Sequence, residues 1–305
     1  MNGIIAFFDA TLLNSTFRSL APILLAALGG LICARAGVFN VALEGLMLFG
    51  AFAAVAGSYY ASNAWVGVLV AVVACVLVSG ILSLGTVTMG GDPIVLGIAL
   101  NLLAVGMTTF LLRVLFHVQG IFQNPRLKGL PRISLPGIQH IPSVRTALSG
   151  ETALVYLGWG LVIVAQIVLF RHAWGLRLRG VGEDPDAAAT FGVDVRRYRH
   201  VAVALSGVLC GLAGAQLSLG NVTLFAENMS AGRGWIALVA VLLGRAHPIG
   251  VLAAAFLFGL ADAIGFRLQG AGLPSQFTGA LPYVVTLVAL FGLRGRLRIA
   301  LRGVG

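Results

Sequence analysis

The sequence predicts an all-α protein that crosses a membrane many times. Hydrophobic residues make up 59% of its 305 residues and charged residues only 10%, whereas soluble globular domains carry about 25% charged residues. The apolar runs are long and uninterrupted, which is typical of membrane helices and unlike the short alternating segments of an outer-membrane barrel. We therefore expect a single transmembrane domain over residues 1–305, without a separate soluble domain.

Eight apolar segments are long enough to cross about 30 Å of hydrocarbon, and a ninth is not. The ninth, Trp235–Leu243, follows a polar interruption and is expected to form a short helix that cannot cross alone. With a cytoplasmic tail, nine crossings place the N-terminus outside and eight place it inside. The eight long segments are approximately residues 17–34, 38–59, 64–84, 94–116, 153–170, 201–219, 249–266 and 277–293.

Two polar stretches must lie in water on opposite sides of the membrane. Gln119–Glu151 holds four prolines and mixed polar residues, so it is too irregular for a membrane-spanning helix. Arg171–Arg199 holds six arginines and four acids, which hydrocarbon cannot accommodate. One predicted span separates the two stretches. We expect the second stretch in the cytoplasm, which places the first outside despite its own basic residues.

The distribution of charged and metal-binding residue types argues against several functions. The formal net charge is +10, but half of the twenty basic residues lie in residues 171–199 and 294–302, as expected of cytoplasmic segments and not of a nucleic-acid-binding face. The three cysteines lie in apolar runs and the five histidines are dispersed, so no metal site is expected. The N-terminus lacks the basic region and cleavage site of a removable signal peptide.

A short helix is expected inside the Arg171–Arg199 loop. Asp184 suits an N-cap, Pro185 the first helical position, and Gly192 a left-handed end. The result is about two turns of helix with a body of small residues. Such a helix fits closely into a groove of another protein, although a solvated loop with an incidental helical turn explains the same residues.

The run GLRLRGVGEDPDAAATFGVDVRRYR, residues 175–199, resembles the cytoplasmic coupling loop of permease subunits in bacterial ABC importers. The similarity is to the branch that serves branched-chain amino acids, simple sugars and nucleosides. In that family the helix of this loop docks into the ATP-hydrolysing subunit. The resemblance therefore implies that contact with an ATPase involves Gly182, Glu183, Asp184, Pro185, Ala187, Ala188 and Gly192.

Ionisable residues within spans cost about 2.5 to 3.5 kcal/mol each on insertion scales, so those that are kept are candidates for function or for packing. Asn40 and Glu44 lie four residues apart, and we expect them on one face of a helix. That face lines a polar path or bonds to a neighbouring helix. Asp262 lies among small residues and is expected to pair with an arginine such as Arg113 or Arg267.

Two further stretches carry the same resemblance. GVFNVALEGLMLFGAF, residues 37–52, resembles the start of a span in nucleoside-type permeases, and Phe225–Ala237 resembles the family's glycine-rich broken helix. Irregular backbone at membrane depth is tolerated only where protein or a cavity surrounds it, and an external loop is the alternative. Asn101 matches a family asparagine, although a packing hydrogen bond is its favoured role. The resemblance implies a translocation pathway near Asn40, Glu44, Asn101, Glu227, Asn228, Ser230 and Arg233.

The resemblance covers residues 20–293 and implies an ABC importer permease that carries a nucleoside across the bacterial inner membrane. A simple sugar or a branched-chain amino acid is the alternative substrate. The implied partners are an ATPase subunit, a second and different permease chain, and an extracytoplasmic substrate-binding lipoprotein. The sequence contains no GxxxxGK[ST] motif, so we expect a non-enzymatic chain without a cofactor, with ATP bound by its partner. The rival class is an ion-coupled carrier acting alone, with Glu44 and Asp262 as ion sites.

Overall fold

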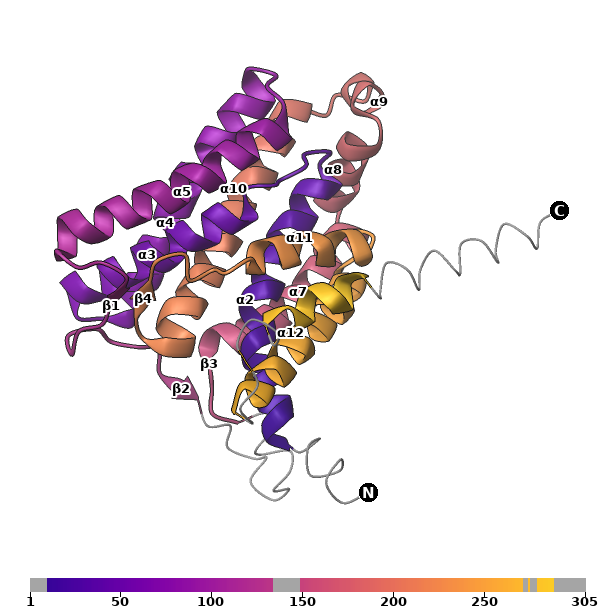
Figure 1. Cartoon of the computed structure of the whole chain (residues 1–305). Coiled ribbons are helices and arrows are strands. Elements are labelled where there is room, and N and C mark those ends of the chain that lie inside the picture. The colour runs from indigo at the N-terminus through magenta and orange to yellow at the C-terminus, as the bar shows by residue number, and fades with distance from the viewer. Residues whose placement is uncertain (1–9, 134–148, 271–273, 275–278, 288–305) are drawn as a thin grey trace.

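The computed structural model describes residues 10–133, 149–270, 274 and 279–287, and its long helices form one bundle (Figure 1). Seven helices in this part of the chain are long and apolar enough to cross a membrane, and all seven correspond to predicted segments. The eighth predicted segment, residues 277–293, is described only in part, and residues 281–287 of it are helical. The seven are α2 (Ala10–Arg35), α3 (Leu43–Ala61), α4 (Ala64–Ser83), α5 (Pro93–Phe116), α7 (Ala153–Arg171), α10 (Val195–Ala215) and α12 (Pro248–Gly270).

The centre of the bundle is formed by α2 and α10, which pack against each other. Helix α12 packs on α2, while α4 packs on α10 and α3. In the most apolar stretch of 18 residues in α2, 78% of the residues are buried. In the corresponding stretches of α5 and α7, only 28% are buried. The many exposed leucines and valines of α5 and α7 suit contact with lipid, which is as apolar as these side chains.

The two ends of the bundle carry different polar structures (Figure 1). One end, the α9 end, holds α8 (Ala173–Glu183) and α9 (Pro185–Thr190). The other, the β end, holds two antiparallel pairs of two-residue strands, β1 (Ile121–Phe122) with β4 (Phe225–Ala226) and β2 (Arg132–Ile133) with β3 (Glu151–Thr152). Because α7 runs from β3 to α8, the two polar stretches lie at opposite ends, as the sequence predicts.

Helix boundaries depart from the predicted ones by five residues or more at three places. The first span, predicted to start at Phe17, starts at Ala10 in α2. The predicted start of the second span at Val38 is wrong, because residues 38–41 are not helical and α3 begins at Leu43. The predicted start of the sixth span at Val201 is too late: α10 begins at Val195, where Asp194 accepts a hydrogen bond from the backbone N–H of Arg197 (3.0 Å). Within the described part of the chain, two helices end in π-helical turns, η1 (Leu84–Thr88) after α4 and η2 (Gln216–Val222) after α10.

Candidate functional site

The short predicted helix is present as α11 (Arg233–Leu243), and it begins inside the protein, at the first turn of α3. The carboxylate of Glu44 accepts hydrogen bonds from the backbone N–H groups of Gly232 (2.9 Å) and Gly234 (2.6 Å). Gly232 itself offers no side-chain cap. Unpaired N–H groups and a partial positive charge mark every helix N-terminus, so a buried carboxylate is stabilising there. Glu44 therefore caps α11 from another helix.

Asn40 and Glu44 do not share a helix face, so that prediction is wrong. Asn40 precedes α3, and its side-chain oxygen accepts a hydrogen bond from the N–H of Ala42 (2.9 Å). This local bond gives the backbone an alternative to the helix. The side-chain amide of Asn40 donates to Oγ of Ser206 in α10 (2.9 Å). Asn40, which is 2% exposed, thus holds the non-helical segment against the centre of the bundle.

Asn101 of α5 also forms hydrogen bonds to the backbone around the start of α3. Its side-chain oxygen accepts from the N–H of Gly45 (2.8 Å), and its side-chain amide donates to the carbonyl of Val41 (3.0 Å). Asn101 is buried, so these bonds replace those that water would make at the start of α3. The packing interpretation of Asn101 matches its contacts.

An ion pair lies beside the start of α11. Arg233 contacts Asp262 of α12 at 3.3 Å, and the two side chains are 17% and 20% exposed. The predicted pairing of Asp262 with an arginine is confirmed, but the arginine is Arg233 and neither Arg113 nor Arg267, because α11 brings its own first residue to α12. The pair borders a cavity of about 150 Å³ that Gln269 and Tyr283 also line.

The remaining pathway candidates lie along the irregular segment that leads to α11. The carboxylate of Glu227 accepts from the N–H of Gly120 (3.2 Å), which places Glu227 beside β1 at the β end. Asn228 is exposed and has a positive φ of 55°. Ser230 is buried, and its Oγ has no hydrogen-bond partner among the described residues. The structure thus places Arg233 between the two glycines whose N–H groups bond to Glu44, and it places Glu227 beside β1.

The predicted short helix in the loop is confirmed as α9. Asp184 accepts hydrogen bonds from the N–H groups of Asp186 (3.1 Å) and Ala187 (2.9 Å), and Pro185 occupies the first turn. Gly192 ends the helix with a φ of 77°, a conformation that side chains disfavour, and its N–H donates to the carbonyl of Ala189 (2.9 Å).

The surface of α9 differs from the predicted contact set at two positions. Ala188 is buried, so it packs on the chain itself and is not free for a partner. Phe191, which directly follows α9, is 86% exposed and is not among the predicted contact residues. The predicted residues that are exposed are Glu183, Asp184, Ala187 and Gly192, while Gly182 and Pro185 are half-buried.

Helix α8 connects α9 to the rest of the bundle through the last turn of α2. Gly182 lies so close to α2 that a β-carbon there would overlap the carbonyl oxygen of Arg35. Arg199 of α10 donates to the carbonyl of Ala36 (3.3 Å), next to the same turn. Arg35 in turn donates to the carbonyl of Ala246, at the far end of α11 (2.6 Å). This role of Arg35 could not be predicted from the sequence, because a lone arginine between two spans gives no signal for it.

The described residues contain no group of three or more histidine, cysteine, aspartate or glutamate side chains placed to hold a metal ion. All three cysteines are buried, and none forms a disulfide bond.

Long apolar helices, a short apolar helix capped by a buried carboxylate and a projecting surface helix define a multi-pass membrane protein. The chain belongs to the family described as "Branched-chain amino acid transport system / permease component", whose model matches residues 12–290. It is accordingly a multi-pass permease of the cytoplasmic (inner) membrane.

Curated relatives match nearly the whole chain. It is 34% identical to a guanosine ABC transporter permease protein of Bacillus subtilis over 90% of this chain and 89% of the relative. It is 37% identical to a nucleoside ABC transporter permease protein of Lactococcus lactis over 88% and 87%. A putative glucose ABC transporter permease protein of Haloferax volcanii is 36% identical over 87% and 80%.

A solved structure confirms the predicted ABC permease fold. The chain matches an inward-facing conformation of a putative metal-chelate type ABC transporter with a TM-score of 0.55 and 19% sequence identity. The match covers 92% of this chain and 85% of the other.

Proposed function

We propose that the chain is the permease subunit of an ATP-driven importer and that its substrate is a nucleoside. The observation that carries this proposal is the similarity to guanosine and nucleoside permease proteins, at 34% and 37% identity over about nine tenths of the chain. A simple sugar is the second candidate substrate, because a putative glucose permease protein is equally similar.

The proposed complex contains a second, different permease chain. In support, B. subtilis has another guanosine permease protein that is 24% identical to this chain, and L. lactis has another nucleoside permease protein that is 23% identical. The sequence lacks a GxxxxGK[ST] motif, so we assign ATP binding and hydrolysis to a separate ATPase subunit. An extracytoplasmic lipoprotein delivers the substrate to the β end, and this chain needs no cofactor.

In this proposal α9 docks on the ATPase, with the α9 end in the cytoplasm. Its support is local: α9 is capped at both ends, projects from the bundle and exposes Phe191. Force on α9 passes through α8 to the turn at residues 35–37, where Gly182 and Arg199 contact it. Arg35 then transmits the movement to the end of α11. Alternating access arises when ATPase closure shifts this chain of contacts.

The proposed pathway passes the start of α11. Arg233, Asp262 and Tyr283 line the cavity there and supply charged and hydroxyl groups that can bond to the hydroxyls of a ribose. Glu44, Asn40 and Asn101 position the helices that form this region, since their polar atoms contact the chain itself. Glu227, Asn228 and Ser230 border the approach from the β end.

Transport by the purified complex tests the proposal. The tagged chain is purified with its companions, reconstituted in vesicles with ATP on the ATPase side, and given labelled guanosine, uridine, glucose or leucine together with the binding lipoprotein. We expect ATP-dependent uptake of a nucleoside that excess glucose does not reduce. Uptake of glucose alone would establish the second candidate, and uptake by the isolated chain under an ion gradient would establish a carrier.

A further inference from the structure

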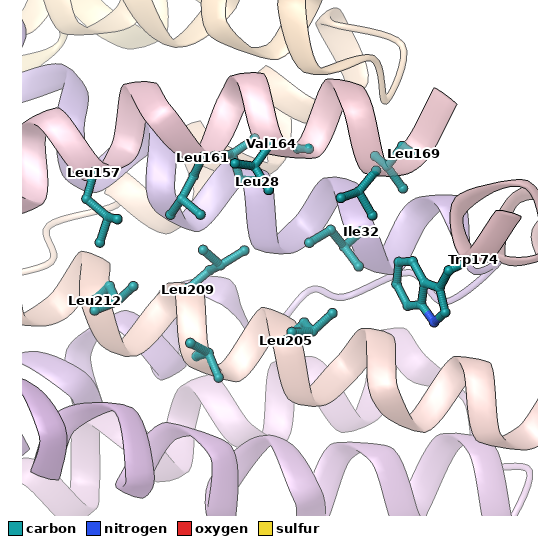
Figure 2. A pocket seen from close by; sticks show the side chains of 13 residues that line it. Leu28, Ile32, Leu157, Leu161, Val164, Leu169, Trp174, Leu205, Leu209 and Leu212 are labelled. Carbon is teal, nitrogen blue, oxygen red and sulfur yellow. The ribbon is translucent and has the colours of Figure 1, made fainter. Parts of the chain in front are cut away.

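An apolar groove runs along the bundle between α2, α7 and α10 (Figure 2). Its volume is about 290 Å³, and no polar atom is exposed in it. In Figure 2, side chains of α7 point across the groove toward those of α10, and Trp174 of α8 stands at one end. The labelled lining residues are Leu28, Ile32, Leu157, Leu161, Val164, Leu169, Trp174, Leu205, Leu209 and Leu212.

The groove continues into a second, basic cavity at the α9 end. This cavity has a volume of about 490 Å³, shares Trp174 with the groove and includes Arg177 and Arg197 in its lining. Along α10, Arg197 and Val201 line the basic cavity, and the helix turns beyond them line the groove. Spacings of three and four residues place these side chains on one helix face. The same face of α10 therefore leads from the basic cavity into the wholly apolar groove.

The arginines of this cavity are available for an anion. Both are exposed, and neither forms an ion pair with another described residue. Asp194 also lines the cavity, but its carboxylate accepts the backbone N–H of Arg197 (3.0 Å) and caps α10. Trp174 stacks on Tyr198, with ring centroids 5.9 Å apart, where the basic and apolar cavities meet. Tryptophan and tyrosine are enriched at this level of a membrane, between headgroups and hydrocarbon.

We infer that the groove and the basic cavity together bind an anionic phospholipid. One acyl chain fills the groove, and the phosphate lies between Arg177 and Arg197. Between Leu157 and Leu169, α7 rises about 18 Å, close to the roughly 15 Å of one leaflet's hydrocarbon. Arginine binds phosphate through paired, charge-assisted hydrogen bonds. Basic pockets between membrane helices bind lipid headgroups in this way.

A helix of a second protein does not fit the groove. A cylinder of the diameter of a helix and about 18 Å long occupies about 1,400 Å³ or more. The empty space of the groove, its open side included, is about 820 Å³. A partner helix can lie over the groove but cannot enter it. Along the chain, α7 leads into α8, and α10 follows α9. A lipid bound between α7 and α10 would therefore hold these two helices at a fixed spacing.

Fluorescence quenching by brominated lipids tests the site in the full-length chain. Replacement of Trp65, Trp159 and Trp235 by phenylalanine leaves Trp174 as the only tryptophan. The protein is reconstituted in phosphatidylcholine vesicles that contain brominated phosphatidylglycerol or, at the same mole fraction, brominated phosphatidylcholine. We expect the anionic lipid to associate at least threefold more strongly, as judged by quenching of Trp174.

Matched variants separate the headgroup contact from the acyl groove. Arg177→Gln with Arg197→Gln should reduce the preference for the anionic lipid to about one, whereas Arg196→Gln, at an exposed arginine outside the cavity lining, should preserve it. Ala165→Phe, in the groove, should reduce quenching by both lipids. Ile163→Phe, at a 63% exposed position outside the groove lining, should not.

Three results would overturn the inference. Equal quenching by the two lipids means that the groove holds ordinary boundary lipid without headgroup selection. Absence of quenching by either means that protein covers the groove. Loss of the preference on adding inorganic phosphate, but not chloride at equal ionic strength, means that the arginines bind the free ion. None of these results depends on which solute the permease carries.

Discussion

Helices α9 and α11 of this permease both begin at a carboxylate cap, and they obtain it in opposite ways. The carboxylate of Asp184 caps α9 through N–H groups two and three residues along the chain. The carboxylate of Glu44 caps α11 through N–H groups 188 and 190 residues away. The first cap is exposed at the end of the bundle, and the second is buried inside it. A local cap shapes one element, whereas a distant cap joins two halves of the protein.

The contribution of each cap to the free energy of unfolding depends on its surroundings. Water can replace the lost acceptor at α9, so an exposed cap is worth about 1 kcal/mol. No water replaces a lost acceptor at membrane depth, and a buried unpaired N–H group costs about 1–3 kcal/mol. The comparison therefore predicts that substitution of Glu44 mainly lowers the stability of the protein, whereas substitution of Asp184 mainly lowers transport.

The largest expected effect is that of Glu44→Ala on stability. It leaves the N–H groups of Gly232 and Gly234 unpaired in the interior, which should lower the free energy of unfolding by about 3–5 kcal/mol. The measurement is thermal unfolding in detergent with a thiol-reactive dye, because all three cysteines are buried until the protein unfolds. Glu227→Ala, which removes a half-buried acceptor of one N–H, is the control. Equal losses in the two variants would remove the distinction between the caps.

The ion pair beside α11 should show the next largest effect. Asp262→Asn and Arg233→Gln each break the 3.3 Å contact, and each should lower the free energy of unfolding by about 1–3 kcal/mol. Arg233→Gln should be the worse of the two, because residue 233 stands in the chain between the two glycines whose N–H groups bond to Glu44. A double-mutant cycle measured with the same dye checks the pair. Additive losses would show that the two side chains act independently.

Loss of the exposed cap should reduce transport with little effect on stability. Glu183→Ala with Asp184→Ala should lower the free energy of unfolding by about 1 kcal/mol or less. If α9 docks on an ATPase, uptake by the complex should fall at least tenfold while ATP hydrolysis continues. Asp184→Asn keeps the capping oxygen and should retain uptake. Normal uptake in the double variant would contradict the docking role.

The smallest effect concerns Glu151, a buried carboxylate at the β end. Burial raises its pKa above the ordinary value for glutamate, although Arg18 at 3.4 Å and Arg132 oppose the shift. A raised pKa in the folded state means that the ionised carboxylate destabilises the fold at high pH, and that this penalty disappears as the pH falls through the folded pKa. Glu151→Gln should therefore be more stable than the parent at pH 8, with a smaller difference at pH 5. Thermal unfolding followed by tryptophan fluorescence checks this, and a difference that grows toward pH 5 would contradict it.

Predictions from sequence succeeded where the physical signal is local. The seven described spans follow from apolar length, and α9 follows from Asp184, Pro185 and Gly192. Prediction failed at Asn40, because a spacing of four residues indicates a shared helix face only if the segment is helical. A side-chain bond to Ala42 and another to Ser206 keep it non-helical. An arginine partner for Asp262 was predicted correctly, but its identity as Arg233 was not, since nothing in the sequence around Asp262 indicates that α11 lies beside it.

The sequence by itself determined that this chain is a bundle of membrane helices with one capped helix projecting at an end. Apolar length and local capping act over a few residues and leave a pattern that can be read directly. Only the tertiary structure decided that Glu44 would cap α11, that Asn40 and Asn101 would hold the start of α3, and that Arg35 would join α2 to the far end of α11. These bonds connect distant segments, and apart from the Oγ of Ser206, which bonds to Asn40, their partners are backbone groups. Residue type therefore cannot reveal them before the helices are packed.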